Sequence, residues 1–228
     1  MATDKEIKKK VTEDWLNSFP HLSPFAQNKL YKIIGCLIFG IEAVNVPNIE
    51  GYKPHIVIYP LWMHDVKKCL DTPSLYICIV NKKGLQFSIP YSKHNQYFNE
   101  ALECFKNQNT VSLNGNVSLK SLFAFIDSLF SDMLIKTNSM QQAKLFELKF
   151  HLALYVGSQV QIQNVLTQIQ QARKSWDMQM FETWYGSFDL WVQRLLEKAS
   201  RRDEFLDQVE INKQDKKIAK LQNSELTE

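Results

Sequence analysis

Residues 74–91, SLYICIVNKKGLQFSIPY, contain the pattern that decides the fold. The segment 74–80 carries apolar residues on both alternating faces, which is typical of a central strand covered on each side. The segment 84–91 alternates apolar with polar residues: Leu85, Phe87 and Ile89 against Gln86 and Ser88. The short polar loop from Asn81 to Gly84 predicts a type I turn in which the glycine takes a positive φ. The two segments should therefore form a hairpin, and the sheet should be mostly antiparallel.

Toward the N-terminus, the segment HIVIYPLW (55–62) is rich in β-branched and aromatic residues and predicts another strand. Residues 36–46 predict the end of a helix and then a further strand, so we expect about four strands in all. The pair Ser23-Pro24 is typical of a helix start, with serine as the N-cap and proline at the first helical position. It predicts a helix that continues through Ile34. An amphipathic helix before it is predicted from Ile7, Val11, Trp15 and Phe19.

The positions of proline separate this mixed half from a helical half. All seven prolines precede residue 91, and none follows. Because proline breaks helix interiors, a stretch without it permits long helices. A helix at 93–105 follows the sheet, so we expect a mixed α/β half over residues 1–110.

Four helices are predicted after residue 111 from apolar residues at steps of three and four. The stripes lie at 119–134, 143–154, 162–176 and 181–199. Short polar joints between them imply antiparallel neighbours, so residues 111–200 should form a helical bundle packed on the mixed half.

Residues 201–228 have a different composition, with many mixed charges and few large apolar residues. Their apolar positions hold no heptad register, which predicts a solvated helical or disordered tail that is dispensable for folding. The expected fold is thus α+β: N-terminal helices and an antiparallel sheet, then a helical bundle and a charged tail.

The four cysteines indicate free thiols. Cys36, Cys69, Cys78 and Cys104 form no CxxC pair, and most lie in apolar stretches where cysteine behaves as a small core residue. A chain of 228 residues can bury enough apolar surface to fold without disulfides. Together with an N-terminus that lacks a secretory signal, this predicts a cytoplasmic protein.

Sequence motifs for catalysis or cofactor binding are absent. The seven glycines form no phosphate-binding loop, and no GxSxG or HExxH occurs. His55, His64 and Cys69, with Asp65 or Asp71, match no compact metal-ligand spacing. No metal or cofactor is therefore predicted. An enzyme with a Cys/His centre assembled from distant residues stays open, with Cys36, Cys69 or Cys104 as its thiolate. Lys67 and Lys68 would lower the pKa of Cys69 by charge attraction.

The charge balance argues against a polycation that binds nucleic acid. Lys and Arg number 27 and Asp and Glu 24, a net charge of +3, and only four of the cations are arginine. A lysine-based nucleic-acid binder is the third alternative, through Lys67 and Lys68 or through Lys82 and Lys83. Lys82 and Lys83 are also candidate contacts for a partner protein. No apolar run is long enough to cross a membrane.

Aromatic residues are the most suggestive feature. Five Trp, eight Tyr and 14 Phe make up 12% of the chain. The stripe at 181–199 is wider than one neighbouring helix usually covers, so part of it should be exposed. We expect Trp191 to lie in the core and Trp184 or Tyr185 to lie at an exposed margin, where such residues dominate protein-binding surfaces.

The leading functional hypothesis is a non-enzymatic protein-binding protein. A bacterial neutralising (immunity-like) or adaptor protein that occludes its partner suits a small α+β chain without catalytic motifs. Its candidate partner-binding residues are Trp184, Tyr185, Lys82 and Lys83.

Overall fold

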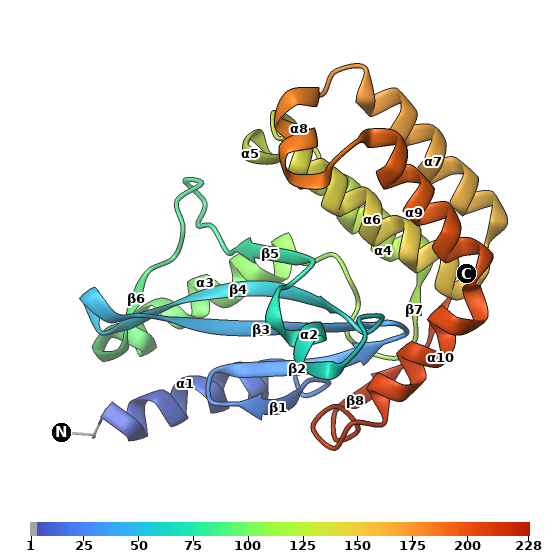
Figure 1. Cartoon of the computed structure of the whole chain (residues 1–228). Helices are drawn as coiled ribbons and strands as arrows, with labels where there is room; N and C mark the ends of the chain where they lie inside the picture. Colours follow the sequence, from blue (N-terminus) through green and yellow to red (C-terminus); the bar gives the residue numbers. More distant parts are fainter. Residues whose placement is uncertain (1–3) are drawn as a thin grey trace.

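The structure of the chain is a computed structural model that describes residues 4–228, and the predicted α+β class is confirmed (Figure 1). The sheet half contains α1 (Asp4–Ser18), β1 (Ser23–Ala26), β2 (Lys29–Ile34), β3 (Leu37–Val46), β4 (Gly51–Pro60), α2 (Val66–Asp71), β5 (Leu75–Cys78), β6 (Ile89–Pro90) and α3 (His94–Gln108). The helical half contains β7 (Val117–Ser118), α4 (Leu119–Leu129), α5 (Met133–Lys136), α6 (Ser139–Val156), α7 (Gln159–Arg173), α8 (Met178–Tyr185) and α9 (Phe188–Ser200). The chain continues through α10 (Arg202–Lys213), β8 (Gln222–Ser224) and β9 (Leu226–Thr227).

The main sheet is antiparallel in the order β1-β2-β3-β4-β5. The predicted hairpin after β5 is present, because Gly84 has a φ of +76° and the Asn81 N–H donates to the Leu85 carbonyl at 2.8 Å. An antiparallel bridge joins Val80 to Gln86. The second strand of this hairpin is much shorter than predicted: only Ile89–Pro90 is a strand, and it pairs with β4. Most of residues 84–91 therefore form an extended loop.

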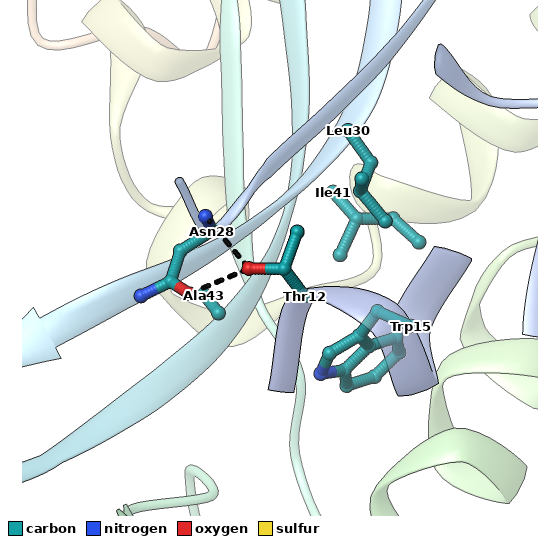
Figure 2. A pocket seen from close by; sticks show the side chains of 6 residues that line it. All are labelled: Thr12, Trp15, Asn28, Leu30, Ile41 and Ala43. Carbon is teal, nitrogen blue, oxygen red and sulfur yellow. Dashed lines mark hydrogen bonds between the residues drawn. The ribbon is translucent and has the colours of Figure 1, made fainter. Parts of the chain in front are cut away.

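The helix predicted from Ser23-Pro24 is wrong, because residues 23–34 form the hairpin β1–β2. The strands join at Asn28, which has a φ of +64°. The backbone N–H of Asn28 donates to Thr12 Oγ1 of α1 at 3.2 Å, which holds the turn in place (Figure 2). Pro24 lies on β1, an edge strand, where the missing N–H costs little. The ladder between β2 and β3 outweighs the local helix-start signal.

One face of the sheet is aliphatic and is covered by helices. Leu30, Ile41 and Ala43 pack against Trp15 of α1 so closely that the contact leaves no room for a water molecule (Figure 2). On the same face, the Phe39 ring lies 6.5 Å from Phe125 of α4. This contact joins the sheet to the helical half.

The predicted helices of the second half are present, with two additional breaks. The helix expected over 119–134 ends at Leu129 and resumes at α5, whose N-terminus is capped by Asp132 through the Leu134 N–H at 2.8 Å. The stripe at 181–199 is divided at Gly186, whose φ is +73°, into α8 and α9. Because the apolar residues of this stripe are divided between two helices, they do not all lie on one helix face.

Residues 201–228 are helical in part, as predicted, but the prediction that they form a solvated tail is wrong. Helix α10 leads from the helical half back to the sheet (Figure 1), where β8 pairs parallel with β2 and β9 pairs parallel with β7. Five apolar side chains of this segment are buried: Phe205, Val209, Ile218, Leu221 and Leu226. Asn212 Nδ2 donates to the carbonyls of Leu61 and Met63 at 2.8 and 2.6 Å. A few buried apolar side chains are enough to hold this segment in place, because the rest of the fold supplies the surface against which they pack.

Candidate functional site

The corner between α8 and α9 separates the aromatic residues into buried and exposed ones. Trp191 is 1% exposed and its Nε1 donates to Glu147 Oε1 of α6 at 2.6 Å, whereas Trp184 is 71% exposed. Tyr185 is half-buried, with its ring centroid 5.9 Å from that of Trp191. The expected division between a core Trp191 and a marginal Trp184 is confirmed.

Trp184 belongs to an exposed apolar surface at one end of α6. It lines a hollow of about 320 Å³ together with Met180, and Met133 and Leu134 of α5 are also exposed. Gln142 of α6 links α5 to the loop that precedes α8, because its Oε1 accepts from Trp176 Nε1 at 2.9 Å and its Nε2 donates to the Lys136 carbonyl at 2.8 Å. Figure 1 shows α5 and α8 at the same end of the bundle. We call Met133, Leu134, Met180 and Trp184 the Trp184 patch.

The candidate lysines lie elsewhere. Lys82 and Lys83 are exposed in the turn after β5, and Lys82 Nζ is 3.9 Å from Glu103 Oε2 of α3. The structure therefore places the four predicted contact residues on two separate elements, with Trp184 and Tyr185 together on α8.

A cleft lies between the sheet half and the helical half, and Trp62 lines both of its chambers. The larger chamber, of about 340 Å³, is also lined by Arg194, Lys198, Arg201, Glu204 and Phe205. The smaller chamber, of about 220 Å³, is also lined by Met63, Lys144, Glu147, His151 and Tyr185. We call this the Trp62 cleft. Tyr185 faces it, so adjacent residues of α8 contribute to different surfaces.

Burial shifts the pKa values of ionisable groups in the Trp62 cleft. It lowers the pKa of His151 to about 3, assisted by repulsion from Lys198. It raises the pKa of Glu147 and lowers the pKa of Lys198, each shift being opposed by attraction between the two groups. The His151 ring stacks on Trp62 at 4.4 Å. Perturbed titratable groups in a cleft between two parts of a fold are a common mark of a binding site. No sequence pattern indicates this site, because its residues come from five separate segments.

One Cys/His pair is assembled by the sheet. Cys78 Sγ is 2.9 Å from His55 Nε2, because the register of β4 and β5 places these residues opposite each other. Burial raises the pKa of Cys78 and lowers the pKa of His55, so the proton stays on sulfur and the pair is neutral. Cys78 was not among the predicted nucleophiles. The cross-strand register that creates the pair is invisible in the isolated sequence.

The other thiols do not have the properties of a nucleophile. All four cysteines are free, as predicted, and Cys36, Cys69 and Cys104 are buried. The expected lowering of the Cys69 pKa by neighbouring lysines is wrong, because burial raises it. Asn212 Nδ2 is 3.4 Å from Cys69 Sγ.

Within residues 4–228, no cluster of three or more His, Cys, Asp or Glu residues is arranged to hold a metal ion. Within the same range, no helix combines the length and the apolar character needed to span a bilayer. Comparisons with protein-family models, curated proteins and solved structures found no match.

Proposed function

We propose that this chain is a non-enzymatic protein-binding protein, of the neutralising (immunity-like) or adaptor kind, which docks on its partner through the Trp184 patch. The observation that carries the proposal is the exposure of Trp184, which lines a hollow with the exposed Met180 at the end of the bundle where Met133 and Leu134 of α5 are exposed as well (Figure 1). Exposed apolar groups of this size cost free energy in water, and tryptophan is enriched among the residues that dominate binding energy.

The border of the Trp184 patch indicates the chemistry of the partner. Exposed acidic side chains lie next to it: Asp132 before α5, Asp177 before α8 and Glu182 within α8. Lys136 is the cation of α5. A partner that inserts apolar side chains from a surface bordered by Lys and Arg would complement this arrangement. An acidic border would repel nucleic acid, which supports a protein partner.

The neutral state of the Cys78–His55 pair favours the non-enzymatic hypothesis over a cysteine enzyme. A nucleophilic cysteine works as a thiolate, and the pKa directions of both groups keep the proton on sulfur. A cytoplasmic location is part of the proposal and is supported by the four free thiols.

Affinity capture with a matched set of variants tests the proposal. Wild type, Trp184→Ala and Ile211→Ala are immobilised, and proteins retained from source cells are identified by mass spectrometry. Ile211 is the control because it is 62% exposed on α10, away from the Trp184 patch. The partner so identified is then purified and its Kd is measured by calorimetry. We expect Trp184→Ala to weaken binding roughly 30-fold or more and Ile211→Ala to leave it unchanged.

Equal affinity of all three proteins for the purified partner would contradict docking through the Trp184 patch. A Lys82→Gln/Lys83→Gln double variant extends the same measurement to the other predicted contact. A loss of binding confined to that variant would move the interface to the turn after β5.

A further inference from the structure

The Trp62 cleft contains a buried hydrogen-bond acceptor without a partner. His151 is 5% exposed, and its Nδ1 lies 2.6 Å from the Glu147 carbonyl oxygen. Because a carbonyl can only accept, Nδ1 carries the proton and Nε2 of the neutral ring is an acceptor. Nε2 is buried and has no hydrogen-bond partner among the described residues. Buried polar atoms are rarely left unpaired, so this nitrogen is an unusual feature of the wall of the smaller chamber.

The larger chamber of the same cleft has cations that are not neutralised by ion pairs. Arg194, Lys198 and Arg201 line it, and within residues 4–228 none of them forms a salt bridge. Glu197 and Glu204 also line the chamber, which leaves a surplus of positive charge. Arg194 is oriented by a 2.8 Å hydrogen bond from its Nη2 to the Tyr185 carbonyl. An anionic group would be attracted to this chamber.

The wall between the two chambers is aromatic. Trp62 lines both, and its ring is stacked with His151 in a row that continues to Phe205, whose centroid is 5.8 Å from that of His151. A flat apolar group packs well on such a surface. The volume of the larger chamber, about 340 Å³, lies at the lower end of the range of sites for small organic molecules.

We propose that the Trp62 cleft is a binding site for a small aromatic anion. Its carboxylate or phosphate is held by Arg194, Lys198 and Arg201, and its flat part packs on Trp62. The site is separate from the Trp184 patch, so the inference does not depend on the proposed function.

A set of matched probes tests this proposal. Indolecarboxylate combines a flat ring, an N–H group and an acid; indolecarboxamide is its neutral counterpart; acetate has the acid without the ring. Naphthyl phosphate replaces the carboxylate by a phosphate and separates the two possible sources of the charge. Binding to the full chain is measured by ligand-observed NMR and calorimetry. We expect at least one aromatic anion to bind about tenfold more tightly than indolecarboxamide, and acetate to bind more weakly still.

Two variants locate the binding. Arg201→Gln removes a cation of the larger chamber whose side chain is exposed, so folding should be retained and checked by thermal melting. Lys174→Gln removes an exposed cation at the end of α7, outside the cleft. We expect Arg201→Gln to weaken binding of the aromatic anion about tenfold and Lys174→Gln to have no effect. The proposal is overturned if no aromatic anion binds, if the neutral probe binds equally well, or if Arg201→Gln binds like wild type.

Discussion

Residues 178–200 and residues 201–228 are neighbours in the chain, but they differ in how far their apolar side chains are buried. The first segment is dense in aromatic residues, yet it leaves Trp184 71% exposed. The second is rich in charged residues, yet Phe205, Val209, Ile218, Leu221 and Leu226 are all buried. Apolar density in a sequence therefore does not decide burial. The available opposing surface decides it.

The opposing surface differs for geometric reasons. In α9, Phe188, Trp191 and Leu195 recur at helical spacing and all face the bundle. The Gly186 break gives α8 its own direction, so Trp184 falls outside the area that α6 and α9 cover. In the C-terminal segment, α10 lies beside the end of β4, where Asn212 reaches two backbone carbonyls, and β8 extends the sheet.

The largest expected effect is that of removing residues 202–228. Burying one large aliphatic or aromatic side chain contributes about 1.5–3 kcal/mol. The five buried side chains of the segment together then contribute on the order of 10 kcal/mol, which is comparable to the whole free energy of unfolding of a typical domain. We expect the truncated protein to lose cooperative thermal unfolding and near-UV circular dichroism. A soluble product that melts within a few degrees of wild type would contradict the importance of this segment.

A point variant tests the attachment of the C-terminal segment to the rest of the fold without truncating the chain. Asn212→Ala leaves the carbonyls of Leu61 and Met63 without their donor, and we expect it to cost about 1–3 kcal/mol in urea unfolding. Ile211→Ala, on the exposed face of the same helix, is the control and should stay within about 0.5 kcal/mol of wild type.

Among the point variants, the largest effect separates the two tryptophans. Trp191→Ala should lower the free energy of unfolding by about 3–5 kcal/mol, because it opens a cavity and removes the donor to Glu147. Trp184→Ala should change it by less than about 0.5 kcal/mol. Urea unfolding of both variants measures the difference. Equal losses would mean that Trp184 is packed as core and would remove the basis of the Trp184 patch.

The smallest effect concerns His151 of α6, whose ring stacks on Phe205 of the C-terminal segment. Its pKa is lowered from 6.5 to about 3 in the folded protein, mainly by burial. The unfolded chain therefore takes up this proton first, and the stability that depends on neutral His151 is present above pH 6.5 and lost as the pH falls toward 3. Between pH 7 and pH 5 the loss from this residue is about 2 kcal/mol.

Comparing wild type with His151→Phe isolates this contribution. Phenylalanine keeps a ring beside Trp62 and Phe205, and the variant retains the other histidines with lowered pKa values, His55 and His94. The drop in stability between pH 7 and pH 5 should be smaller in the variant by about 2 kcal/mol. An identical drop in both proteins would show that His151 takes up its proton in the folded state near the ordinary pH.

Features that depend on a few consecutive residues could be predicted from the sequence. The turn at Gly84 is of this kind, since its conformation follows from local chemistry. Residues 23–34 could not be predicted in this way, because their strand conformation depends on pairing with β3.

The candidate sites follow the same division. The exposure of Trp184 could be anticipated, because a stripe wider than one helix face has to leave a margin. The Cys78–His55 contact depends on cross-strand register, and the Trp62 cleft depends on packing between distant segments. Neither leaves a pattern along the chain.

The parallel pairing of β8 with β2 has a consequence for the order of folding during synthesis. β1 covers the edge of β2 as far as Tyr31, and β8 continues along that edge from Lys32. Gln222, whose N–H donates to Ser23 Oγ, is 199 residues further along the chain. At about 5–20 residues per second, a ribosome adds this stretch in roughly 10–40 s. For that time the nascent sheet has an open, isoleucine-rich edge, which is the kind of surface that chaperones recognise and that aggregates when unprotected.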